Sequence, residues 1–185
     1  MINTYAIDPG VHTCALAAFG AVDKTLFGLI ETDVWKWGPI HGDSVIVLEI
    51  PRSDAEHPER SNDLIDLNGA GWRLVGQIEA YTEGSSKVVR RMARNSKAGR
   101  GWKGQTPKPI HHAQVIKRLT PDELAIVEGL YVPRKRSQDP GTLTDFVASA
   151  CKHLSVSHDW HSWYKNQIHN PLDAVALGLT HFGRM

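Results

Sequence analysis

Three acidic residues lie where a carboxylate could do chemistry. Asp8 ends an apolar segment, Glu49 interrupts the apolar run 45–50, and Asp173 lies in the first turn of an expected helix. An ionised carboxylate in a buried strand is unfavourable by several kcal/mol unless a cation, a proton or a ligand compensates it. For Glu49 the structural alternatives are a salt bridge, for example to Arg52, or a strand end that emerges into water.

These acids could share one site if the strands that carry Asp8 and Glu49 are neighbours in a sheet. Their carboxylates would then lie side by side at its edge, and Asp173 on a packed helix would complete the cluster. Three converging carboxylates repel one another, and Mg²⁺, which takes oxygen ligands and keeps waters, relieves that repulsion. Two such ions about 3.5 to 4 Å apart can activate a water and stabilise the leaving oxygen in phosphodiester hydrolysis.

A basic tract offers a surface for the substrate of such a site. Residues 84–121 contain no Asp or Glu and ten Lys or Arg, whereas the rest of the chain has eleven Lys or Arg against twenty acids. Clustered Lys and Arg displace counterions from phosphate backbones, so this tract favours a polyanionic partner. A solvated charged surface is the alternative, but glycines interrupt the tract and argue against a plain charged helix face. Trp102, flanked by glycines and basic residues, could stack on a base or meet a dimer partner.

Hydrophobic periodicity predicts the elements that position these residues. We expect strands over 3–7, 13–19, 26–32, 45–50 and 87–92. We expect helices over 61–81, 110–119, 121–128, 142–154 and 170–182. This order predicts one α/β domain over residues 1–185, with a mixed five-stranded sheet of three antiparallel and then two parallel strands and helices on both faces.

Two of the expected helices carry more specific signals. Thr120-Pro121-Asp122-Glu123 has the pattern of a capping box with proline at the first helical position. In the helix over 61–81, Trp72 is expected in the core. Glycines at 69, 71 and 76 in the same helix indicate close packing against a second helix, such as one across a dimer axis.

Composition excludes several classes of protein. The 185 residues are 41% hydrophobic and 22% charged, which is typical of a globular domain. No apolar run approaches the roughly 20 residues that a membrane-spanning helix needs. The first residues lack the pattern of a signal peptide, and two distant cysteines make no disulfide framework, so we expect a cytoplasmic protein.

The ordered set of motifs resembles RuvC-type Holliday junction resolvases of the ribonuclease H-like superfamily, in a divergent form that suggests a phage-encoded member. The segments that carry the resemblance are Ala6-Ile7-Asp8-Pro9-Gly10, Val45-Ile46-Val47-Leu48-Glu49, the helix over 63–80, Trp102-Lys103-Gly104 with Lys108, Gln114-Val115, and Asp173-Ala174-Val175-Ala176-Leu177.

The resemblance implies a homodimeric, Mg²⁺-dependent endonuclease that cuts branched DNA in recombination and repair, in the cytoplasm of a bacterial or phage-infected cell. Two Mg²⁺ ions per site are implied, with Mn²⁺ as a substitute. The implied metal ligands are Asp8, Glu49, Asp173 and Asn170. The implied catalytic residues are these four with Lys103. The implied DNA contacts are Lys108, Arg90, Arg91, Arg94, Arg100 and Trp102.

The fourth acidic position of the family departs from its pattern. The family has Asp or His three residues before the last Asp, and this chain has Asn170 there, with His169 one residue earlier. Asn170 could ligate Mg²⁺ through its oxygen, His169 could act as a base, or Asn170 could cap the helix before Pro171. The alternative functions are a ribonuclease H-like nuclease acting on other DNA or on RNA, and a non-catalytic nucleic-acid-binding scaffold.

Overall fold

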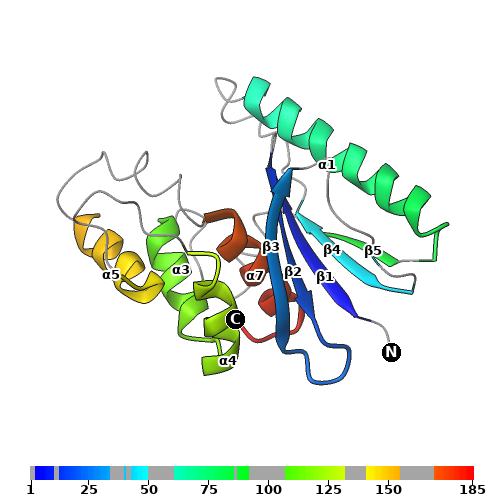
Figure 1. Ribbon diagram of the computed structural model, residues 1–185. Coiled ribbons are helices and arrows are strands. Elements are labelled where there is room, and N and C mark those ends of the chain that lie inside the picture. The colour runs from blue at the N-terminus through cyan, green and yellow to red at the C-terminus, as the bar shows by residue number, and fades with distance from the viewer. Residues whose placement is uncertain are drawn as a thin grey trace.

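Five strands form one mixed sheet in the order β3-β2-β1-β4-β5 (Figure 1). The computed structural model describes residues 3–10, 13–33, 40, 43–49, 61–85, 87–91, 107–131, 141–154 and 169–185. The strands are β1 (Thr4–Pro9), β2 (Thr13–Phe19), β3 (Leu26–Asp33), β4 (Val45–Glu49) and β5 (Lys87–Arg91). The helices are α1 (Ser61–Tyr81), α3 (Lys108–Ile116), α4 (Pro121–Glu128), α5 (Leu143–His153) and α7 (His169–His181).

The pairing of the strands confirms the predicted fold class. β1 pairs with β2, and β2 with β3, in antiparallel directions, because each connection is too short for the crossover that parallel strands need. β1 pairs with β4, and β4 with β5, in parallel directions. The fold is therefore the predicted α/β arrangement with three antiparallel and then two parallel strands, and the strands that carry Asp8 and Glu49 are neighbours.

Helices cover both faces of this sheet, as predicted. Figure 1 shows α1 across one face and α7 against the other, with α3, α4 and α5 on the same side as α7. Contacts between the elements agree, since α1 meets β1 on its face, α7 meets β1 to β4 on the other, and α3 packs on both α5 and α7. Helix α7 is buried from Pro171 to Leu179 because the sheet lies on one side of it and α3 on the other.

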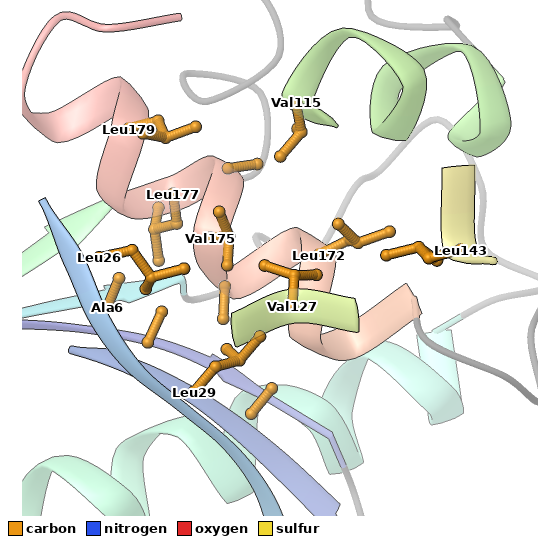
Figure 2. Close-up of a cluster of buried hydrophobic side chains, with 14 of the residues drawn as sticks. Ala6, Leu26, Leu29, Val115, Val127, Leu143, Leu172, Val175, Leu177 and Leu179 are labelled. Atoms are coloured by element: carbon orange, nitrogen blue, oxygen red, sulfur yellow. The ribbon is translucent and has the colours of Figure 1, made fainter. Parts of the chain in front are cut away.

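The core between the sheet and α7 is made mostly of alanine, valine and leucine side chains, with a few aromatic ones (Figure 2). Gly178 permits the closest approach of α7 to the sheet. A Cβ atom at this position would lie less than 3.0 Å from three ring carbons of Phe19. Phe19 is itself fully buried, and its ring packs edge-on against that of Phe182, with the ring centroids 5.6 Å apart. The spacing between α7 and β2 is therefore set by the absence of a side chain at residue 178.

The second core lies between the sheet and α1. Leu74, Val75 and Ile78 of α1 are buried there. The prediction that Trp72 lies in the core is wrong, because its side chain is 48% exposed. At about 100° per residue, Trp72 projects well away from the side of the helix that holds these three residues.

A buried ion pair joins the last residues of the chain to α4. Glu123, only 1% exposed, accepts hydrogen bonds at 2.7 Å from Nη1 and Nη2 of Arg184. It also accepts bonds from the backbone N–H groups of Leu26 at 2.8 Å and Thr120 at 2.9 Å. The bond from Thr120 is half of the predicted capping box, which is confirmed. One carboxylate thus connects α4, β3 and the end of the chain.

Some boundaries differ from those expected. β1 continues through Pro9, so Asp8 lies inside the strand, and the turn follows at Gly10, whose N–H bonds to the carbonyl of Thr13 at 2.7 Å. Helix α3 begins at Lys108, earlier than expected, because Pro109 is tolerated in the first turn of a helix.

Two further expectations concern covalent links and membranes. Cys14 and Cys151 form no disulfide. Among the helices described here, none is long and apolar enough to cross a membrane.

Candidate active site

Asp8 and Glu49 lie next to each other at one edge of the sheet. The parallel register pairs Ile7 with Leu48, and Asp8 and Glu49 are the next residue on each strand. Side chains alternate between the faces of a sheet, and Ile7 and Leu48 belong to the core on the α1 side. Asp8 and Glu49 therefore face α7, which carries the third acid.

Asp173 lies near the start of α7 and is only 8% exposed. Two side chains of α3 reach its carboxylate. Nζ of Lys108 donates to Oδ2 at 2.5 Å, and Nε2 of His112 lies 3.0 Å from Oδ1. Lys108 and His112 are four residues apart, so they lie on one face of the helix. Helix α3 therefore holds both oxygens of this carboxylate.

The electrostatics of Lys108 connect all three acids. Burial is the largest single influence and lowers the pKa of its ammonium group. Attraction to Asp173, then to Asp8 and more weakly to Glu49, together with the hydrogen bond to Asp173, outweighs burial and raises the pKa above its ordinary 10.5. The three carboxylates, which come from β1, β4 and α7, thus all act on the charge of one cation, which is hydrogen-bonded to Asp173.

The donor set is suited to a hard divalent cation. Carboxylate oxygens are the ligands that Mg²⁺ prefers, and three of them carry more negative charge than one ammonium group balances. Within the part of the chain that the structure describes, no three His, Cys, Asp or Glu side chains are arranged so that they could hold a metal ion. In this arrangement the ammonium group of Lys108 provides the positive charge. The residues fit Mg²⁺ in donor type and in charge.

Asn170 contacts the sheet. Helix α7 begins one residue earlier, so Asn170 lies within its first turn and does not precede the helix as a cap. Its Nδ2 donates to Oγ1 of Thr13 at 3.3 Å and to Oε1 of Glu31 at 3.2 Å. The side chain of His169, the alternative fourth group, lies outside the described residues.

Sequence reasoning missed Glu31. The register places it opposite Ala15, which is opposite Asp8, so Glu31 and Asp8 lie in one row on the same face of the sheet. Because side chains along a strand alternate between the two faces of a sheet, the sequence of β3 could have placed Glu31 on this face. Its contact with Asn170 could not be predicted in this way, because Asn170 lies on α7, far away in the sequence. His112 was missed for the same reason, because its contact depends on how α3 packs against α7.

The structure describes only part of the basic tract. Lys108 is bound to Asp173 and is 31% exposed in its side chain. Arg90 and Arg91 lie in β5, and only their backbone is described. The backbone of Arg91 is opposite that of Glu49 in the parallel register of β4 and β5. The remaining predicted contacts, Arg94, Arg100, Trp102 and Lys103, lie outside the described residues.

Comparison with known proteins gives no match in sequence. No protein-family model matches the chain, and no curated protein matches it. Among solved structures, it is similar to a structure described as T. thermophilus RuvC in complex with Holliday junction substrate, with 14% identity, a TM-score of 0.44, and coverage of 91% of this chain and 99% of that chain. A structure described as Thermus thermophilus RuvC has 14% identity and a TM-score of 0.37, and the match covers 100% of this chain and 96% of that chain. At such identity and TM-scores, neither similarity bears on the chemistry of this chain.

Proposed function

We propose that this protein is a metal-dependent endonuclease that hydrolyses phosphodiester bonds in branched DNA. The observation that supports it is the placement of Asp8 and Glu49, adjacent at one end of the sheet, on the face that packs against α7, the helix that carries Asp173. Three acids from separate elements are kept together at a cost in mutual repulsion, which a purely structural role does not require. A site that binds divalent cations explains why they are together.

In this proposal Asp8, Glu49 and Asp173 hold the metal. Bound Mg²⁺ supplies Lewis acidity, which activates a water and stabilises the leaving oxygen of a phosphodiester. Asp8 and Glu49 are fixed by the parallel pairing of β1 and β4, and Asp173 is fixed by α3. Lys108, partly exposed beside them, is a mobile cation that can also meet a phosphate.

The basic tract is proposed to hold the DNA. Its charge would bind phosphates with little dependence on sequence, so selectivity for a branch must come from shape. Lys108, Arg90, Arg91, Arg94, Arg100 and Trp102 are the proposed DNA contacts, and Lys103 is proposed near the scissile phosphate. Asn170 remains a proposed fourth ligand through its side-chain oxygen, since its Nδ2 is the atom that donates to β2 and β3.

Paired cuts need two sites at a fixed spacing, and we propose a homodimer formed through the outer face of α1. Ile65 and Trp72 are 61% and 48% exposed on this face. Gly69 and Gly76 lie on the same face, and a Cβ atom at either position would meet nothing within 4 Å. Two apolar side chains alternating with two glycines would let a second helix approach closely. Sedimentation equilibrium is expected to give twice the mass of the chain, and a monomer at all concentrations would contradict this proposal.

Cleavage of a panel of substrates tests the proposed activity. End-labelled four-way junctions, flaps, linear duplexes and RNA:DNA hybrids would be incubated with Mg²⁺, with Mn²⁺ and with EDTA. We expect paired nicks in the four-way junction with either metal and none with EDTA. Equal cutting of linear duplex would contradict selectivity for branches, and preferred cutting of the hybrid would favour a ribonuclease. Binding of DNA without cleavage would identify a scaffold.

A further inference from the structure

His112 has no part in the site as predicted from the sequence, yet it contacts one of the three acids. It lies on α3 one turn after Lys108, and its side chain is 0% exposed. Its Nε2 is 3.0 Å from Oδ1 of Asp173, while Lys108 takes the other oxygen. The two contacts differ in accessibility, since Lys108 is 31% exposed. Asp173 is thus held from the interior by His112 and from the more open side by Lys108.

We infer that His112 is a positioning residue, which holds Oδ1 of Asp173 so that Oδ2 stays turned toward Lys108. The inference rests on the proposed function. An aspartate carboxylate can rotate about the bond to its Cβ, and a donor on one oxygen restricts that rotation. Carboxylates that bind metals are in turn held by hydrogen bonds, and loss of such a partner weakens metal affinity or activity by about 10- to 100-fold.

The imidazole is itself held in place, as this role requires. Its ring packs edge-on against that of His111, with centroids 5.7 Å apart and planes at 85°. Helix α3 packs against both α7 and α5, and Val115, one turn further on, is fully buried in the same core. A buried donor whose ring is packed in this way can hold Asp173 in one orientation whether or not Lys108 remains bound to it.

Two substitutions separate positioning from packing. His112→Leu keeps a buried apolar side chain of similar size and removes the donor. His112→Gln keeps an amide N–H that can reach Asp173. Thermal unfolding measures the packing contribution of each change, and titration with Mn²⁺, followed by electron paramagnetic resonance at one pH, measures metal affinity.

We expect His112→Leu to bind Mn²⁺ about 10- to 100-fold more weakly than the wild type, and His112→Gln to restore most of that loss. At saturating Mn²⁺ the leucine variant is expected to lose kcat for DNA cleavage with KM for DNA unchanged. If the leucine variant does not fold, His112→Asn takes its place, because its shorter amide stops short of Asp173.

The outcomes distinguish the inference from the function on which it rests. Equal Mn²⁺ affinity in the wild type and in the variant without the donor would overturn the positioning role alone. Weakened affinity that His112→Gln fails to restore would also overturn it, since packing would then explain the loss. A wild-type protein that binds no Mn²⁺ would overturn both the proposed function and this inference.

Discussion

An Asp8→Asn variant is expected to bind DNA at least as tightly as the wild type and to cut it about 1,000-fold more slowly or not at all. Asp8 is fixed by strand pairing on both sides, so the substitution leaves the fold unchanged. It removes a carboxylate from the proposed metal site, and a bound ion contributes several kcal/mol to the transition state. It also removes one negative charge close to the proposed DNA-binding surface, which favours binding of the phosphates.

The measurement is cleavage of a four-way junction with Mg²⁺, alongside a gel-shift assay in EDTA. Asp66→Asn is the matched control, because this substitution removes the same charge at a distant position. Asp66 is exposed on α1, which lies on the face of the sheet opposite to α7. We expect the control to cut at the wild-type rate. An Asp8→Asn protein that cuts within a few-fold of the wild type would refute the assignment of this acid.

The largest effect on stability is expected at Glu123, outside the proposed site. Glu123→Gln keeps the size of the side chain but removes the charge opposite Arg184 and one of the two acceptor oxygens. Breaking a buried, hydrogen-bonded ion pair from one side costs about 3 kcal/mol or more. For a chain of this length, that loss lowers Tm by about 6 to 12 °C.

Acid should remove the same stabilisation from the wild type. Although burial raises it, hydrogen bonds from Arg184, Leu26 and Thr120 lower the pKa of Glu123 from 4.5 to about 2. In the unfolded chain this carboxylate takes up a proton near its ordinary pKa, whereas in the folded protein it does so only near the lowered one. Its contribution to stability is therefore complete above about pH 5 and is lost as the pH falls toward about 2.

Urea unfolding of the wild type and of Glu123→Gln between pH 3 and pH 7 checks both expectations. The difference between the two proteins should be largest near pH 7 and should shrink on acidification. Asp122→Asn is the control on the same helix, because Asp122 is exposed and its loss affects only the helix dipole, by about 0.5 kcal/mol. A difference that stays constant with pH would show that Glu123 acts by packing rather than by charge.

The sheet could be predicted from the sequence because its information is local. Alternation and apolar runs locate the strands, and the order of strands and helices then leaves few topologies. The same reasoning brings Asp8 and Glu49 to one edge, since neighbouring parallel strands carry their ends together. The capping box at Thr120 could also be predicted, because both of its hydrogen bonds join residues that are three positions apart in the sequence.

The rest of the site depends on packing between helices, which periodicity does not encode. The contacts of Lys108 and His112 with Asp173 join residues 65 and 61 positions apart, and nothing in the pattern of α3 indicates which helix it meets. The pairing of Asn170 with Glu31 is of the same kind. Trp72 shows a related limit, because an apolar stripe does not reveal how much of a helix the sheet can cover.

The tight fit of Gly178 against Phe19 has a consequence for genetics. Gly178 is five residues along α7 from Asp173, a distance of about 7.5 Å in an α-helix. A side chain there would push that end of the helix away from the sheet, and the rigid helix would tilt Asp173 relative to the acids on the strands. A screen for loss-of-function alleles should therefore recover changes at codon 178 that mimic changes in the proposed active site, although this residue is buried and lies outside that site.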